Sequence, residues 1–374
     1  MHLAELLARR PVPAAAVFVA LTRRCPLRCR HCSTMSETTS EQQPAALLQR
    51  FVASFTPGDH PEFLLLTGGE PLLRPGLVRA LAGTARAAGT RSYLLTGAFF
   101  ARAGKTAASI LAALESVDHV AVSTDVFHEA EVPRPQLFRV LHDILAAGRD
   151  ASIQACGTGP DDPYLADLMQ HVRREFGERV PMLVTTVRPV GRARAWLAVP
   201  GGGPQPGTAA RAGHRLAAAP CDLASWPVVG FDGTITACCN SDVLQAGPMA
   251  GHLRLGHISS TTWPQVRRAA VSSPMLRGLR TRGPLQLAHG VAEPDEPRPA
   301  SASYCGTCRS LSGRPAVVRS IEAEAARPAS ALIEQQAIAL QLAAGPAGFA
   351  RRHGDPTRAD LVLLGYRGPA GGAA

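Results

Sequence analysis

Residues 25–32 read Cys25-Pro-Leu-Arg-Cys29-Arg-His-Cys32, a C-x3-C-x2-C spacing that directly follows a short apolar run. Nine cysteines placed at random in 374 residues would give this spacing only about 0.005 times per chain. Cysteine thiolates are the usual ligands of iron–sulfur clusters, and a cubane normally takes four of them. Three ligands leave one metal position open, which is where a reacting molecule can bind. A zinc site with a distant fourth ligand is the alternative at this point.

Outward from this segment, short apolar runs alternate with helical patterns through the first half of the chain. We expect strands at 17–21, 63–67, 92–96, 120–124, 152–155 and 182–187. We expect helices between them at 44–55, 75–88, 106–114, 135–147 and 164–176. An interval of about thirty residues between strands is typical of βαβ units, so the pattern predicts an α/β fold with a parallel sheet. It does not distinguish an open sheet from a partial barrel.

A second motif follows the second apolar run. The segment Thr67-Gly68-Gly69-Glu70-Pro71 ends that run, as the cysteines end the first. In this order the two motifs resemble those of the radical S-adenosylmethionine (SAM) superfamily. The resemblance implies a partial (β/α)6 TIM-like barrel whose site lies at the carboxyl ends of the strands.

The resemblance also implies roles for individual residues. The catalytic [4Fe-4S] cluster would be coordinated by three cysteines and SAM, the cysteines being Cys25, Cys29 and Cys32. The methionine end of SAM would be held by Gly68, Gly69, Glu70 and Pro71, and His31 would lie near its adenine.

Further cofactor-binding candidates follow the later strands. By the same resemblance, Ser123 and Asp125 would contact the ribose or carboxylate of SAM, Arg188 its carboxylate or the substrate, and Gly191 its adenine. The alternatives are helix capping or a turn for Ser123 and Asp125, a surface arginine for Arg188 and a plain turn for Gly191. Cys156 is interpreted as a core cysteine, and no general base is assigned.

A second group of cysteines lies in the C-terminal half. Cys221 and Cys238 frame a C-x11-G-x4-C pattern, and Cys305 and Cys308 form a C-x2-C pair. This region resembles SPASM domains in their shorter twitch form, which implies one auxiliary [4Fe-4S] cluster held by these four residues. Cys239 is a possible substitute for Cys238. A structural zinc site is the alternative.

The composition shift at a Gly/Pro-rich stretch suggests the division of the chain. We expect a radical SAM barrel core at 1–198, a linker at 199–215, a SPASM/twitch-like domain at 216–312, and a helical segment with a partly disordered basic tail at 313–374.

Charge and hydropathy exclude several classes of protein. The net charge is +10, yet no aromatic-rich basic motif accompanies it, so we expect no nucleic-acid partner. No run of eighteen apolar residues occurs, and the N-terminus lacks the order of a secretion signal, so we expect a cytoplasmic protein without a membrane span. Its cysteines should then be reduced thiols rather than disulfides.

The resemblance implies an oxidoreductase that uses a radical. An external donor such as flavodoxin or ferredoxin would supply an electron, SAM would yield a 5′-deoxyadenosyl radical, and that radical would abstract hydrogen from the substrate. We expect a ribosomally synthesised peptide as substrate, in natural product biosynthesis. The alternative is a twitch-type dehydrogenase or epimerase of a small polar metabolite such as an aminocyclitol or sugar. A non-catalytic zinc-binding protein is a further alternative.

Overall fold

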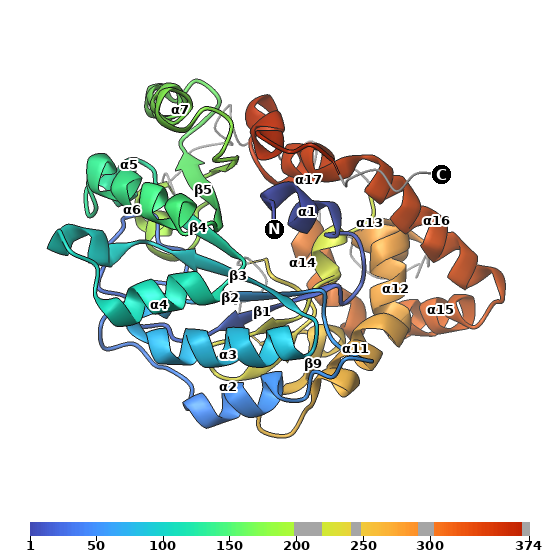
Figure 1. Cartoon of the computed structure of the whole chain (residues 1–374). Helices are drawn as coiled ribbons and strands as arrows, with labels where there is room; N and C mark the ends of the chain where they lie inside the picture. The colour runs from blue at the N-terminus through green and yellow to red at the C-terminus, as the bar shows by residue number, and fades with distance from the viewer. Residues whose placement is uncertain (198–218, 241–247, 291–302, 369–374) are drawn as a thin grey trace.

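The structure is a computed structural model that describes residues 1–197, 219–240, 248–290 and 303–368. A sheet curves into a partial barrel with helices on its outside, and a mostly helical C-terminal part lies beside it (Figure 1). The predicted linker at 199–215 lies outside the described residues.

Six neighbouring strands of the sheet are parallel, in the order β6-β5-β4-β3-β2-β1. Their bounds are β1 Ala16–Ala20, β2 Phe63–Thr67, β3 Arg91–Thr96, β4 His119–Ser123, β5 Asp150–Gly157 and β6 Met182–Thr186. Each lies within two residues of the strand predicted from the sequence. The parallel order confirms the predicted partial barrel and brings the carboxyl ends of all six strands to one edge.

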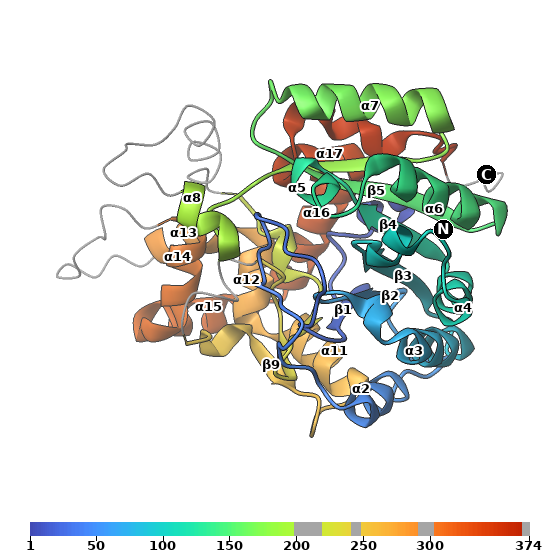
Figure 2. The same ribbon diagram turned by 90° about the vertical axis from the view of Figure 1, so that its left-hand side faces the viewer.

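Amphipathic helices cover the outer face of this sheet (Figure 2). They are α2 Ala45–Val52, α3 Pro75–Ala87, α4 Ala108–Ser116, α6 Arg134–Ala146 and α7 Pro163–Phe176. Helix α3 shows why they form: Leu77, Val78 and Leu81 are buried at helical spacing. Its start at Pro75 suits the first helical turn, and Gly89 follows with a φ of 99°.

Alternate residues of each strand belong to two different cores. In β2, Leu64 and Leu66 pack against the outer helices, whereas Phe63 and Leu65 face the barrel interior. The interior also holds polar groups from β3 and β4. His119 stacks on Tyr93 with ring centroids 5.0 Å apart, and burial lowers the pKa of His119 to about 4.

Both ends of the chain fill the barrel interior. Helix α1 (Leu3–Ala8) contributes Leu3 and Leu6, and helix α17 (Gly345–His353) contributes Phe349, to one buried cluster. Burying a side chain of this size contributes about 1.5–3 kcal/mol. The N-terminal helix is therefore part of the barrel core.

Helices form much of the segment in which a partly disordered tail is predicted. After α17, the 3-10 helix η7 (Pro356–Leu363) buries Val362 and packs beside β6, and the Asp355 amide donates to the Val184 carbonyl at 2.8 Å. Arginine and glycine interrupt the apolar positions here, so the sequence shows no clear helical periodicity.

The sheet continues past β1 with three short strands of the C-terminal half. They are β7 Val228–Val229, β8 Thr234–Thr236 and β9 Arg254–His257. Strand β7 is parallel to β1, and β8 and β9 follow it antiparallel. Hydrogen-bonded strands therefore join the two halves of the chain.

Helices make up most of the remaining structure. They are α11 Trp263–Ser272, α12 Pro274–Thr281, α13 Gly283–His289, α14 Tyr304–Ser310, α15 Pro315–Ala325 and α16 Ala329–Ala343. The short elements are α5 Val126–Glu129, α8 Arg194–Leu197, η1 Pro71–Leu73, η2 Phe99–Ala103, η3 Gly191–Ala193, η4 Asp222–Ala224, η5 Gly251–Leu253 and η6 Leu311–Gly313. Helix α16 has no buried residue, and its Glu334 pairs at 2.8 Å with Arg280, which is only 1% exposed. Among the described residues, no helix is both long and apolar enough to span a membrane.

Candidate active site

The three-cysteine loop leaves the carboxyl end of β1. Cys29 is buried and Cys25 and Cys32 are half-buried, all as free thiols. Burial raises the pKa of the Cys25 thiol to about 12, helped by the negative charges of Glu70, Cys29 and Cys32. Burial also opposes a charge on Cys32, but hydrogen bonds from Thr34 and Ser36 lower the pKa of its thiol. Three free thiols on one short loop, two of them half-buried, fit the ligand set of an iron–sulfur centre.

The Gly-Gly-Glu segment after β2 is docked directly on the cysteine loop. The Gly69 amide donates to the Thr22 carbonyl at 2.7 Å, and the Glu70 amide donates to the Arg24 carbonyl at 2.9 Å. A Cβ atom on Gly68 would lie 2.3 Å from the Thr22 oxygen, and one on Gly69 2.5 Å from the Arg24 oxygen. Glycine is therefore needed at both positions for the two loops to meet.

The Glu70 side chain joins the ends of β2 and β3. Its fully buried carboxylate accepts from the Leu72 amide at 2.9 Å, the Thr96 hydroxyl at 2.9 Å and the Gly97 amide at 3.0 Å. Burial raises the pKa of Glu70 to about 7 although these hydrogen bonds favour the charged form. Pro71 is buried next to it and begins η1. The carboxylate holds the edge of the barrel in shape, and it is the backbone of this segment that faces the cysteine loop.

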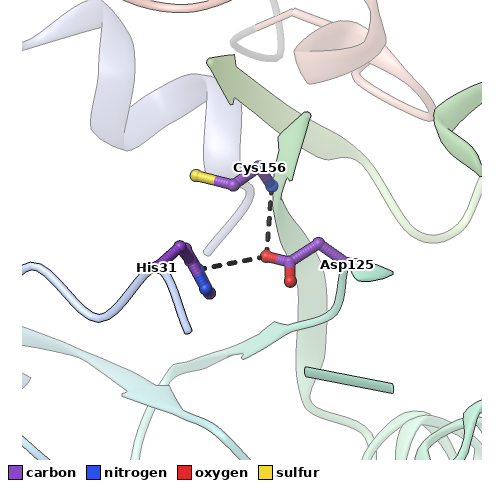
Figure 3. A group of neighbouring side chains, drawn as sticks. All are labelled: His31, Asp125 and Cys156. Atoms are coloured by element: carbon purple, nitrogen blue, oxygen red, sulfur yellow. Dashed lines mark hydrogen bonds and ion pairs between the residues drawn. The ribbon is translucent and has the colours of Figure 1, made fainter. Parts of the chain in front are cut away.

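Asp125 organises a second group after β4. Its carboxylate accepts from the backbone amides of Phe127 and His128 as the N-cap of α5. Oδ2 lies 3.4 Å from His31 Nε2 and 3.3 Å from the Cys156 amide (Figure 3). It also lies 3.0 Å from His128 Nδ1. One potential ligand atom each from His31, Asp125 and Cys156 lie within 4.8 Å of one another. The cysteine loop, β4 and β5 thus meet at one buried carboxylate.

The charges in this group are unevenly distributed. Burial favours a neutral Asp125, but the charge of His128 and its hydrogen bonds hold the pKa of the carboxyl below its usual value. Burial likewise opposes a charge on His128, yet Asp125 raises the pKa of His128 to about 10. Burial lowers the pKa of His31 to about 4. The group therefore holds an ion pair beside a neutral imidazole.

Aromatic rings extend this group towards α8. The Phe127 ring stacks on His31 with centroids 4.7 Å apart and lies 5.4 Å from Trp196. The Trp196 indole donates to the Arg30 carbonyl at 3.0 Å, and the Arg30 guanidinium lies 5.4 Å from its ring. Sequence reasoning missed Phe127 and Trp196. The position of Phe127 four residues after β4 was the available signal, whereas Trp196 lies further on, in α8.

The segment after β6 also docks on the cysteine loop. A Cβ on Gly191 would lie 2.2 Å from the Cys32 carbonyl oxygen, and its φ is 55°. The Arg192 amide donates to that same oxygen at 3.0 Å, and its guanidinium donates to the Ser36 carbonyl. The need for glycine at 191 therefore arises from the cysteine loop itself.

The remaining two predicted site residues lie at the end of β4 and after β6. Ser123 ends β4, half-buried and on the same face as Ala121, which packs in the barrel interior. Arg188 follows β6, and its Nη2 donates to Asn240 Oδ1 at 2.8 Å. Arg188 thus reaches towards the second cysteine region.

The second group of cysteines converges in a separate core. Cys238 and Cys308 are buried in the cluster formed by α12 to α15. Burial raises the pKa of the Cys221 thiol to about 12, with a contribution from the charge of Cys305. The pKa of Cys238 is also raised by burial and by Cys239, Cys221 and Cys308. Four free thiols, two of them buried and two half-buried, fit a metal centre that would compensate their charge.

Cys239 points elsewhere. Its Sγ accepts from Arg10 Nη2 at 2.7 Å. The Arg10 side chain is 3% exposed and lies 4.4 Å from the ring of Trp226. This geometry favours Cys238 over Cys239 as the member of the four-cysteine group.

One family model matches part of the chain. Residues 19–171 are similar to the sequence profile of the radical SAM superfamily. This range includes the cysteine loop, the Gly-Gly-Glu segment and Asp125. No curated protein matches the chain.

Solved structures share the fold at low identity. Streptococcus suis SuiB bound to SAM is 12% identical over 68% of this chain and 65% of its own, with a TM-score of 0.48. SuiB bound to precursor peptide SuiA is 12% identical over 75% and 70%, with a TM-score of 0.50. Native anSMEcpe with bound AdoMet is 12% identical over 87% of this chain and 99% of its own, with a TM-score of 0.49. The match thus spans less than two thirds of SAM-bound SuiB.

Proposed function

We propose that this protein is a radical SAM enzyme that cleaves SAM reductively and abstracts hydrogen from a substrate. The observation that carries the proposal is the docking of the Gly-Gly-Glu segment onto the three-cysteine loop, with two backbone hydrogen bonds and no space for a side chain. A cluster bound there would supply the electron that breaks the bond between sulfur and C5′ of SAM. The protein binds SAM, orients it and excludes water.

The residues around the loop have distinct tasks in this proposal. Cys25, Cys29 and Cys32 hold the cluster and leave one iron open to SAM. The backbone of the Gly68–Pro71 segment receives the methionine end. Gly191 keeps the loop after β6 close to Cys32, where the adenine would pack.

The Asp125 group would receive the nucleoside part of SAM. Asp125 holds His128 in the charged form by an ion pair at 3.0 Å. His31 and Phe127 offer stacked rings to a planar base. Ser123 lies nearby at the end of β4 and could contact the ribose.

We further propose one auxiliary [4Fe-4S] cluster on Cys221, Cys238, Cys305 and Cys308. Cys238, Cys305 and Cys308 pack in one core cluster, and the charge of Cys221 helps to raise the pKa of Cys238, which supports the proposal. When bound, such a cluster can accept an electron from a substrate radical, which makes the overall reaction an oxidation.

The proposed substrate is a ribosomally synthesised peptide. The fold is shared with SuiB, which was solved with its precursor peptide SuiA, and the net charge of +10 suits an acidic peptide. Oxidation or epimerisation of a small polar metabolite is the second candidate, favoured by the presence of four auxiliary cysteines, enough for one cluster. Flavodoxin or ferredoxin would be the reductant.

The test is an anaerobic assay of the purified protein. The chain is reconstituted with iron and sulfide, then given dithionite and SAM, and 5′-deoxyadenosine is quantified. We expect it from the wild type and not from a variant with Cys25, Cys29 and Cys32 changed to alanine. A protein that binds zinc, takes up no cluster and does not bind SAM would overturn the proposal.

The substrate class is tested in the same assay. Acidic peptides and polar cyclitols are added in separate reactions. Each carries deuterium on carbon atoms whose hydrogens do not exchange with water. Transfer of deuterium from a peptide carbon to 5′-deoxyadenosine supports the peptide, and transfer only from a cyclitol supports the second candidate.

A further inference from the structure

Three consecutive residues after β8 point in three directions. Cys238 enters the auxiliary cysteine core, and Cys239 turns to Arg10. Asn240 lies between the cysteine core and the loop that follows β6, and it is only 7% exposed. It is the only asparagine in the chain.

The Asn240 amide joins two parts of the protein. Its Nδ2 donates to Cys305 Sγ at 3.1 Å, and its backbone amide lies 3.4 Å from Cys238 Sγ. Its Oδ1 accepts from Arg188 Nη2 at 2.8 Å. Because arginine only donates, the oxygen must face Arg188, and the nitrogen must then face the sulfur. The orientation of the amide is therefore determined by its neighbours.

We infer that Asn240 is a positioning residue that sets the reduction potential of the auxiliary cluster and couples that cluster to Arg188 at the mouth of the barrel. The inference rests on the proposed auxiliary cluster. A hydrogen bond to a ligand sulfur withdraws electron density from it and stabilises the reduced cluster. Asn240 donates to two of the four proposed ligands. The positive charge of Arg188 on the amide oxygen makes the amide a stronger donor.

The experiment is a redox titration of the reconstituted protein followed by electron paramagnetic resonance. All substitutions are made in a variant whose first cluster is absent because Cys25, Cys29 and Cys32 are changed to alanine. The auxiliary cluster is then observed alone. Asn240→Leu removes the side-chain donor. Asn240→Asp keeps the size and the contact to Arg188 but puts an acceptor against Cys305, so it covers the case in which Asn240→Leu fails to take up iron.

We expect the ratio of reduced to oxidised cluster to fall at least tenfold at a fixed potential in either variant, which is 59 mV for a one-electron couple. Cys239→Ser is the matched control, because its side chain contacts Arg10 instead, and it should leave the ratio unchanged. An unchanged ratio in both Asn240 variants overturns the inference.

The coupling to Arg188 is tested by a double-mutant cycle. Arg188→Gln alone should lower the ratio of reduced to oxidised cluster by less than Asn240→Leu does. The double variant should match Asn240→Leu if Arg188 acts through the amide, and strictly additive effects would refute that link.

Iron content separates this inference from the proposed function. With the first cluster deleted, about four irons per chain are expected. Absence of iron would overturn the auxiliary cluster and the role of Asn240 with it. Four irons with an unchanged potential would overturn the role of Asn240 alone.

Discussion

A methyl group at position 69 should separate the two loops that form the proposed SAM site. In Gly69→Ala, the new Cβ would lie 2.5 Å from both the Arg23 and Arg24 carbonyl oxygens. These are backbone atoms, so no side chain can rotate to make room. The loops must move apart by about 0.5 Å or more to restore ordinary contact.

The magnitude follows from what the movement disrupts. The hydrogen bonds from the Gly69 and Glu70 amides at 2.7 and 2.9 Å would weaken or break, at about 0.5–1.5 kcal/mol each. Overpacking adds about 1–3 kcal/mol. The sum is roughly 2–6 kcal/mol, which for a chain of 374 residues corresponds to a fall in Tm of roughly 3–8 °C.

The assay compares thermal unfolding and iron content in Gly69→Ala and in Gly83→Ala. Gly83 is an exposed position inside α3 with no atom within 4 Å of a new Cβ, so alanine there should stabilise the protein by about 0.5–1 kcal/mol. Gly69→Ala should lower the Tm and take up less iron on the three-cysteine loop. A Gly69→Ala protein with wild-type Tm, full iron and unchanged SAM cleavage would refute the reasoning.

Three further predictions concern the auxiliary region and the interior. Cys238→Ala should lose the auxiliary iron, about half of the total for two cubanes, whereas Cys239→Ala should keep it; equal losses by iron analysis would contradict the assignment. His119 has a folded pKa of about 4, below its unfolded value of about 6.5. The unfolded chain therefore binds the proton first, and the free energy of unfolding falls by up to about 3 kcal/mol as pH drops from about 6.5 to 4. Urea unfolding across this pH range should show a shallower fall in His119→Gln. Glu334→Gln should lower the free energy of unfolding by about 3–5 kcal/mol, because it leaves the buried Arg280 guanidinium without its counter-charge. We expect limited proteolysis to cleave α16 in this variant, and an intact α16 would argue against the prediction.

The sequence was sufficient to predict the partial barrel with its six parallel strands. Its strands are short apolar runs bounded by turn residues, and such runs reveal themselves without tertiary information. The cysteine loop and the Gly68–Pro71 segment were found because their residue types are chemically specific. Their meeting at one edge follows from parallel topology alone.

What could not be predicted depends on contacts between distant segments. Phe349 reaches the barrel interior from the C-terminal end, and no local pattern indicates that destination. The choice between Cys238 and Cys239 depends on Arg10, which lies 229 residues away from Cys239 along the chain. Asn240 is an ordinary polar residue until its contacts with Arg188 and Cys305 are known.

The pairing of β7 with β1 has a consequence for how the chain must be synthesised and folded. The Ala14 and Phe18 amides donate to the Ser225 and Pro227 carbonyls at 2.8 and 2.9 Å. A ribosome that has released only the first 198 residues has exposed β1 as an open sheet edge, a template for pairing with other chains. The sheet edge at β1 is covered only after residues that follow the barrel in the sequence have been synthesised. A chain shortened at the apparent domain boundary would therefore be prone to aggregate.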